Sequence, residues 1–180
     1  MVAEELVELV SESPELTEAL GAELATRLRP GDVVALEGDL GTGKTCFVRG
    51  VARGLGVVGP VTSPTFTLMH VYEGRMSVYH LDAWMTERGE AFLEDGGAEW
   101  LTAEGVALVE WAERVEEWLP PERFEVRLEH RGEGKRGVEL RWLGRGRRLE
   151  GVGTGLRGAG GAGPRGTGGA DPRGAGGATS

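Results

Sequence analysis

The N-terminal part of the chain combines a short apolar-rich stretch with a longer amphipathic one. Residues Glu5–Val10 are expected to form a first strand. Ser13 followed by Pro14 is typical of a helix start, because the serine hydroxyl accepts from a free backbone N–H and proline suits the first helical position. Leucines then recur with helical spacing at positions 16, 20, 24 and 28. The chain therefore begins with a predicted strand and a helix that ends before Pro30-Gly31.

A second strand and helix follow. Val33–Leu36 is an apolar run of the length expected for a buried strand. After Thr45 the apolar residues again fall at helical spacing, and Gly54 and Gly56 indicate the end of that helix. Its expected apolar face consists of Phe47, Val48, Val51 and Leu55.

The rest of the chain continues this alternation and ends in a hairpin. The expected elements are strands at Phe66–Tyr72 and Met76–Leu81, a helix at Glu87–Glu94, a strand at Gly105–Val109, and a helical segment at Val115–Trp118 before Pro120-Pro121. Apolar residues at positions 124, 126 and 128, and at 138, 140 and 142, then alternate with mostly charged residues. This pattern predicts an antiparallel hairpin with one solvent-exposed face.

Composition divides the chain into two parts. Residues 151–180 consist almost entirely of Gly, Ala, Arg, Pro, Thr and Ser, with Val152 and Leu156 as the large apolar exceptions. Such a segment buries too little apolar surface to offset its ordering entropy. We therefore expect a folded domain over residues 1–150 and a disordered Gly/Ala/Arg-rich tail over 151–180. Removing the tail after Glu150 is then expected to leave stability unchanged.

The residues between the second strand and its helix carry the clearest chemical signal. The segment Gly38–Thr45 fits the pattern G-x-x-x-x-G-K-[ST] of a phosphate-binding P-loop. Glycines let the backbone bend around phosphate oxygens and present converging N–H groups. The expected nucleotide contacts are Gly38, Asp39, Leu40, Gly41, Thr42, Gly43, Lys44, Thr45 and Cys46. Together with the alternating elements, the motif predicts an α/β P-loop NTPase-like sandwich with a mixed sheet and a C-terminal antiparallel hairpin.

Two carboxylates follow apolar strands and are candidates for chemistry near a metal ion. Asp82 comes after Met76–Leu81, and Glu110 comes after the 105–109 run. If these strands run parallel to the one before the P-loop, both carboxylates lie at the carboxyl edge of the sheet, where ligands bind. Thr65 lies in a loop rich in hydroxyl groups that could sense a γ-phosphate. For each of these residues, a purely structural surface role is the alternative.

Charge and composition narrow the function. The formal net charge is −9, which disfavours nucleic acid as the primary ligand, because that binding depends on neutralising phosphates. The single cysteine excludes an intramolecular disulfide and agrees with a reducing cytoplasm. No signal peptide and no apolar run of membrane-spanning length is apparent. The chain lacks Asn, so the N-K-x-D motif of GTPases cannot exist, and it lacks Gln to orient an attacking water.

Four motifs in order resemble the TsaE (YjeE) family of bacterial ATPases. They are Gly38–Thr45, Ser63-Pro64-Thr65-Phe66, His80-Leu81-Asp82 and Val109-Glu110-Trp111. The P-loop is common to many families, whereas the S-P-T-F and H-x-D motifs make the combination more specific. The resemblance extends from about Leu6 to Trp142. It departs at Ala83-Trp84-Met85, where the family usually has Leu-Tyr-Arg, so the role of that arginine cannot be transferred.

The resemblance implies a function and a set of roles. The protein would be a cytoplasmic Mg²⁺-dependent ATPase needed for threonylcarbamoyladenosine (t6A) in tRNA. It would act on a TsaD-like threonylcarbamoyltransferase and its TsaB-like paralogue, with tRNA contact indirect at most. Thr45 and Glu110 would be the metal ligands. Lys44, Asp82 and Thr65 would be the catalytic residues, with Asp82 near the γ-phosphate.

Two other functions remain open from the sequence. One is a small-molecule kinase, which the arginine-poor span from Asp82 to Glu117 disfavours because kinases commonly use arginines on a lid. The other is a nucleotide-gated binding module with negligible hydrolysis. ADP release with and without acceptor molecules separates the kinase from the hydrolase, and single-turnover assays with the partner present identify the binding module.

Overall fold

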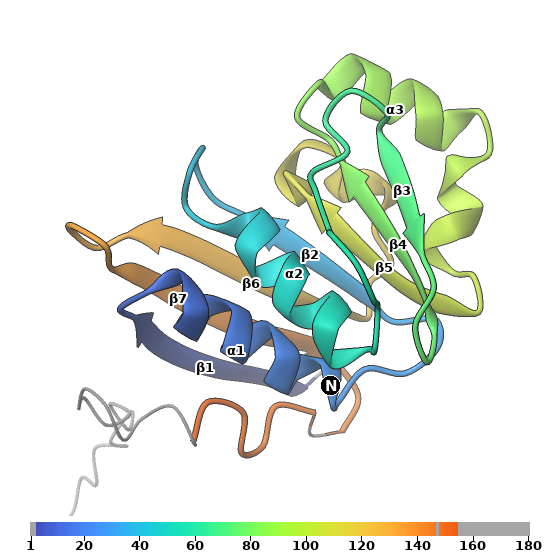
Figure 1. The fold of residues 1–180 in the computed structure, drawn as a ribbon. Helices are drawn as coiled ribbons and strands as arrows, with labels where there is room; N and C mark the ends of the chain where they lie inside the picture. Colours follow the sequence, from blue (N-terminus) through green and yellow to red (C-terminus); the bar gives the residue numbers. More distant parts are fainter. Residues whose placement is uncertain (1–2, 147, 155–180) are drawn as a thin grey trace, which may run out of the picture.

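One mixed sheet organises the part of the chain that the structure, a computed structural model, describes, which is residues 3–146 and 148–154 (Figure 1). Its seven strands have the order β1-β7-β6-β2-β5-β4-β3. The elements are β1 (Ala3–Ser11), α1 (Pro14–Ala25), β2 (Val33–Glu37), α2 (Lys44–Gly54), β3 (Met69–Tyr72), β4 (Ser77–Asp82), α3 (Thr86–Glu94), β5 (Gly105–Glu110), β6 (Arg123–His130) and β7 (Arg136–Gly144), with the 3-10 helices η1 (Gly97–Leu101), η2 (Ala112–Arg114) and η3 (Glu116–Trp118).

Strand directions confirm the predicted mixed sheet. The central strands β6, β2, β5 and β4 are parallel to one another. The β6–β7 hairpin, β1 on β7 and β3 on β4 are antiparallel. The C-terminal hairpin is therefore present as expected, and it joins the parallel centre to the edge strand β1. Because β2, β4 and β5 run the same way, their carboxyl ends meet at one edge of the sheet.

Helices cover both faces of the sheet, as the apolar runs require. Val34 and Leu36 of β2 belong to the core shared with α1 and α2, which lie side by side on one face (Figure 1). Val33 and Ala35 point to the other face and pack in a second core with Leu93 of α3. Alternate residues of one fully buried strand therefore serve two cores, which explains why β2 reads as an uninterrupted apolar run.

The first strand of the middle hairpin is shorter than predicted. We expected Phe66–Tyr72, but β3 begins at Met69, and Leu68 has a φ of 68°. The Leu68 N–H donates to Pro64 O (2.6 Å), which closes a turn over residues 64–68. The apolar Phe66 suggested a strand because its sequence neighbourhood is β-like, yet its side chain is 81% exposed. The chain forms a turn instead of a strand here because the hydroxyls of Ser63 and Thr65 bind Asp82.

The helical segment predicted at Val115–Trp118 is also different. The chain forms two separate 3-10 turns, η2 and η3, rather than one helix. Trp111 at the start of this region has a φ of 61°, which breaks regular structure directly after β5. Val115 is buried, as its spacing predicts. The prediction of a single helical segment is wrong.

The packed part of the chain extends past Glu150, beyond the domain boundary that we expected. Leu149 and Val152 are 2% and 1% exposed and belong to the core shared with α1 and α2. Arg27 of the α1–β2 connection donates to Glu150 O (2.6 Å) and holds the backbone in place. The first four residues assigned to the tail are therefore described, and Val152 is part of the core. The remainder of the predicted tail, residues 155–180, lies outside the described residues.

This packing changes the expected effect of truncation. A chain ending at Glu150 loses the Val152 side chain, whose full burial is worth about 1.5–3 kcal/mol. We expect its melting temperature to be about 5 °C below that of a chain ending at Thr154, given the usual 2–4 °C per kcal/mol at this size. Thermal unfolding of the two truncated chains measures the difference. Equal melting temperatures would show that Val152 contributes nothing to stability.

Candidate active site

The Gly38–Thr45 segment, called the 38–45 loop below, has a backbone that only glycine allows at key points. Gly38, Gly41 and Gly43 have φ values of 132°, 76° and 104°. A Cβ at Gly38 would lie 2.2 Å from Leu128 O, so any side chain there would collide with β6. The three glycines therefore permit both the bend and the close approach of the loop to the sheet.

The loop leads directly into a helix whose first N–H groups face it. Helix α2 begins at Lys44, and its N-cap Gly43 offers no side-chain acceptor. Inside the loop, the buried Thr42 donates its hydroxyl to Asp39 O (2.8 Å), which fixes the turn. Free N–H groups at a helix start, together with the helix dipole, form a favourable environment for phosphate. The backbone therefore fits a phosphate-bearing ligand.

Lys44 brings a buried cation to this loop. Its side chain is 5% exposed, and Nζ donates to Gly38 O (2.5 Å) and Asp39 O (2.9 Å). Burial lowers the pKa of Lys44, and the carboxylates of Glu110 and Glu113 oppose that change. A buried ammonium beside a glycine-rich loop interacts strongly with an anion, because little water screens it.

A hydrogen-bonded chain joins the start of α2 to the end of β5. Thr45 donates its hydroxyl to Glu110 Oε2 (3.0 Å), and the other oxygen, Oε1, lies 2.8 Å from His80 Nε2. Glu110 is 3% exposed and His80 is fully buried. Both oxygens of the carboxylate are thus oriented, one of them toward the threonine at the loop. Thr45 and Glu110, the two predicted metal ligands, are therefore in direct contact.

Asp82 lies beside this chain because Asp82 and Glu110 are register partners on β4 and β5. Its Oδ2 accepts from the hydroxyls of Ser63 (2.6 Å) and Thr65 (2.8 Å), and its Oδ1 accepts from Trp84 N (2.8 Å). The carboxylate is therefore the anchor of the loop before β3. The structure brings the predicted Asp82 and Thr65 into direct contact.

The donor set fits Mg²⁺ bound mainly through a phosphate ligand. Within residues 3–146 and 148–154, no group of three or more His, Cys, Asp or Glu side chains could hold a metal ion. Thr45 and Glu110 offer two oxygens next to the 38–45 loop. Mg²⁺ commonly uses one or two protein oxygens together with substrate phosphates and water. The residues present therefore match this mode of binding.

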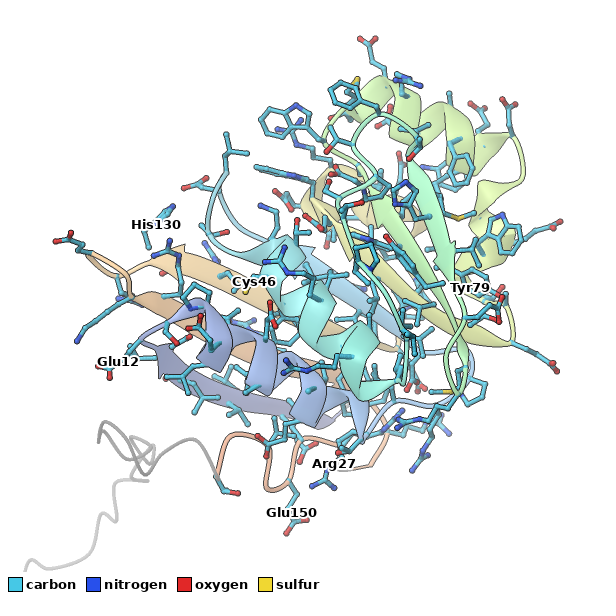
Figure 2. All side chains as sticks on the ribbon, in the orientation of Figure 1. Glu12, Arg27, Cys46, Tyr79, His130 and Glu150 are labelled. Atoms are coloured by element: carbon cyan, nitrogen blue, oxygen red, sulfur yellow. The ribbon has the colours of Figure 1, made fainter. Side chains whose placement is uncertain are left out.

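Two predicted contacts are less central to the loop than the others. Cys46 lies near the N-terminal end of α2 beside α1, where its thiol reaches Pro14 O at 3.2 Å (Figure 2). Burial raises the pKa of this thiol, which keeps it protonated. Leu40 at the loop tip is 75% exposed, so its side chain contacts little of the protein.

Sequence reasoning missed several contacts of the site. It favours an ordinary strand role for His80, with contact to a nucleotide or a partner as the alternative, whereas the ring is bound to Glu110. It did not select Ser63, although Ser63 makes the shortest contact to Asp82. The alternation of β4 is a signal for His80, because positions 80 and 82 face the same side of the strand. Ser63 could have been chosen from its place in the same hydroxyl-rich motif as Thr65.

Glu37, the last residue of β2, faces other acidic side chains. Partial burial and the nearby carboxylates of Glu125 and Glu113 raise its pKa. A raised carboxyl pKa means that ionised Glu37 opposes folding above that pKa, and that the cost disappears as the pH falls below the unfolded value of about 4.3. We expect Glu37→Gln to raise the melting temperature slightly at pH 7 and to have no effect near pH 3. A constant difference across this range, measured by thermal unfolding, would contradict the assignment.

None of the helices in residues 3–146 and 148–154 has the length and the apolar character needed to cross a membrane.

Comparison with known proteins identifies the family. The family model "Threonylcarbamoyl adenosine biosynthesis protein TsaE" matches residues 11–138. A Bacillus subtilis protein named tRNA threonylcarbamoyladenosine biosynthesis protein TsaE is 43% identical over 134 residues, which cover 73% of this chain and 83% of the relative. A protein of the same name from Treponema pallidum is 41% identical over 131 residues, covering 73% of this chain and 97% of the relative.

A solved structure supports the same assignment. The crystal structure of Bacillus subtilis YdiB matches with a TM-score of 0.68 and 36% identity, covering 80% of this chain and 88% of that one. The P-loop NTPase-like fold predicted from the sequence is therefore confirmed, as is the resemblance drawn from the four motifs. TsaE proteins take part in the biosynthesis of threonylcarbamoyladenosine in tRNA. This chain belongs to the TsaE family.

Proposed function

We propose that this protein is a Mg²⁺-dependent ATPase required for the t6A modification of tRNA. The observation that carries the proposal is the meeting of three groups at one edge of the sheet. The 38–45 loop supplies backbone N–H groups and Lys44, Glu110 receives the Thr45 hydroxyl, and Asp82 lies on the neighbouring strand. P-loop NTPases use the same set of groups to bind and hydrolyse a nucleoside triphosphate.

Each group has a distinct role in the proposed reaction. The loop amides and Lys44 bind the phosphates and offset their charge. Thr45 and Glu110 would hold Mg²⁺, which neutralises charge on the phosphate oxygens when it is bound. Asp82, with the hydroxyls of Ser63 and Thr65, sets the position of the loop at the γ-phosphate side. Catalysis then comes mainly from positioning and from a charged site that needs little rearrangement.

The hydrogen bonds of the site support slow hydrolysis by the isolated chain. Asp82 already accepts from two hydroxyls and one amide, and Lys44 donates to two carbonyls of its own loop. A substrate must compete with these contacts. The sequence also offers neither Asn nor Gln to orient a water molecule. These features also favour the second candidate, a nucleotide-gated binding module in which hydrolysis is negligible.

A partner complex is part of the proposal. The relatives are named for t6A biosynthesis, and we propose that this chain acts in the cytoplasm on a TsaD-like transferase and its TsaB-like paralogue. Phe66, next to the loop bound to Asp82, and Leu40, at the tip of the 38–45 loop, are 81% and 75% exposed. Exposed apolar side chains close to a reactive site suit a protein surface better than a nucleic acid. The net charge of −9 likewise argues against direct binding of tRNA.

Turnover of Mg²⁺-ATP with and without the purified transferase and paralogue tests this function. We expect slow hydrolysis by the protein alone and a gain on the order of tenfold or more with both partners. The gain should be smaller than the 10³–10⁵ that an added arginine supplies to some NTPases, because the partners need only to order existing groups.

Each outcome of this assay separates the candidates. Fast turnover that the partners do not change would favour an independent enzyme. ATP binding without hydrolysis in either case would favour the binding module. Phosphate appearing on an added small molecule instead of in solution would identify a kinase.

A further inference from the structure

Trp111 has an unusual backbone directly beside the proposed site. It follows Glu110 at the end of β5 and has φ 61° and ψ 40°, in the left-handed region that a bulky residue rarely adopts. Its side chain is nevertheless 8% exposed. Strained residues of this kind concentrate at functional sites, where surrounding contacts hold them in place. The contacts of the Trp111 indole therefore indicate what the strained conformation achieves.

The indole of Trp111 contacts the lysine of the 38–45 loop. Lys44 Nζ lies 3.5 Å from the centroid of the Trp111 ring, well within the distance of a cation–π interaction. The same ammonium donates to Gly38 O and Asp39 O. The position of this charge is thus set by the loop carbonyls together with the aromatic face of the residue that follows β5. A long lysine side chain otherwise has many rotamers, so the ring reduces its freedom.

A second ring and a second cation hold Trp111 in place. The Trp84 ring centroid lies 4.5 Å from that of Trp111. The Arg114 guanidinium lies over both rings, with Cζ 4.7 Å from Trp84 and 5.0 Å from Trp111. Its Nη1 also donates to Trp84 O (2.6 Å). Arg114 therefore holds the backbone of Trp84 and packs on both rings at once.

The same cluster is connected to Asp82. The Trp84 N–H donates to Asp82 Oδ1, so the residue that packs on Trp111 is also bound to the second carboxylate of the site. Arg114 reaches Thr86 Oγ1 (3.3 Å) at the start of α3, which further fixes the segment after β4. The cluster thus links the positions of Lys44 and Asp82 through side chains that lie outside the 38–45 loop.

We propose that Trp111 is a positioning residue for Lys44, and that Trp84 and Arg114 keep its indole in place. The indole face directs the ammonium toward the phosphate end of the 38–45 loop and excludes water from one side of it. This inference rests on the proposed nucleotide-binding function for its consequence, but the contact itself can be tested without any nucleotide. The competing explanation is that Trp111 merely fills the core next to Val115 and Leu93.

The lysine content of the chain makes the contact directly measurable. Lys44 and Lys135 are the two lysines of the sequence. Lys135 is about half exposed and paired with Glu12 (3.0 Å), so it provides an internal reference. In protein labelled with ¹³C at the lysine ε-carbon, two signals are expected, and Lys135→Arg identifies them. The Lys44 ε-methylene protons should resonate upfield of those of Lys135, because they lie over the indole ring.

Four variants test the role of the cluster. Trp111→Leu should remove the upfield shift, Trp111→Phe should retain part of it, and Arg114→Met should reduce it by loosening the ring. Trp100→Leu is the matched control, because Trp100 packs on Tyr79 (4.9 Å between centroids) away from Lys44 and should leave the signal unchanged. Binding of ADP, measured by calorimetry, should weaken roughly tenfold in Trp111→Leu and less in Trp111→Phe.

The outcomes distinguish this inference from the proposed function. A Lys44 signal that stays in place in Trp111→Leu would overturn the positioning role, as would a lost shift with unchanged ADP affinity. If Trp111→Leu does not fold, the Trp111→Phe and Arg114→Met signals decide the question, and an unmoved signal in both overturns it. Failure of the unaltered protein to bind ADP would instead refute the proposed function, while the ring-current result would still stand.

Discussion

Replacing Lys44 with alanine is expected to lower ATP turnover by at least a factor on the order of 10²–10³, which is the usual cost of losing one charge-stabilising group in an active site. The side chain is the buried cation of the 38–45 loop, and its ammonium lies beside the Gly38 and Asp39 carbonyls of the proposed phosphate site. ATP binding should weaken as well, because the lost group would make charge-assisted contacts with the phosphates. Steady-state turnover and calorimetric titration with ATP measure the two effects.

Lys135→Ala is the matched control for this experiment. It removes the other lysine of the chain, which lies between β6 and β7 and pairs with Glu12 at the surface. Exposed pairs of this type are worth little, so turnover and stability should stay close to those of the unaltered protein. Near-normal turnover in Lys44→Ala would refute the assignment of the 38–45 loop as the phosphate site. Equal losses of turnover in both variants would show that removing either positive charge has the same effect.

Individual strands and helices were predictable where their signals are local. The uninterrupted apolar run Val33–Leu36 indicated a buried strand, and the structure places it between two cores. Ser13 followed by Pro14 marked the start of α1, and the Ser13 hydroxyl does accept from Leu16 N (3.3 Å). Each of these features depends on neighbours in sequence, so periodicity and capping rules were sufficient.

The departures from prediction share a physical cause. Residues 66–68 have a strand-like composition, but the preceding hydroxyls bind Asp82 and pull the chain into a turn. Val152 lies in a stretch that resembles a disordered tail, but it is 1% exposed because the chain passes over the core beside Leu149. In both cases a contact distant in sequence decides the local structure. Composition averages over such single contacts and therefore cannot reveal them.

The candidate site was partly predictable for the same reason. The rule that ligands bind at the carboxyl ends of parallel strands selected Asp82 and Glu110, and the two are register partners. The rule does not say which side chains orient those carboxylates. The contact of His80 with Glu110 and that of Arg114 with both tryptophans depend on side-chain directions across strands and turns. Those directions required the three-dimensional structure.

Separate substitution of Asp82 and Glu110 is expected to separate the loss of ATP hydrolysis from the loss of Mg²⁺-dependent nucleotide binding. Asp82→Asn should lower turnover by a factor on the order of 10²–10³ while ATP affinity changes little, because the Asp82 carboxylate holds the loop that carries Ser63 and Thr65. Glu110→Gln should weaken Mg²⁺-dependent nucleotide binding, because it removes the charge beside Thr45 and keeps the shape of the side chain. Titrations of ADP with and without Mg²⁺, followed by turnover assays, measure the division.

Amide variants are used in place of alanine variants so that a loss of binding can be assigned to the lost charge. Glu110→Ala would leave the fully buried His80 without its Nε2 partner, and the ring already lacks a partner for Nδ1 among the described residues. An unsatisfied buried polar group costs about 1–3 kcal/mol, which could unfold part of the site and mimic a loss of binding.

Glu37→Gln is the control, because Glu37 also ends a parallel strand but faces Glu113 and Glu125. It should leave both Mg²⁺ dependence and turnover unchanged. Loss of Mg²⁺ dependence in Asp82→Asn, with normal dependence in Glu110→Gln, would exchange the roles of the two carboxylates.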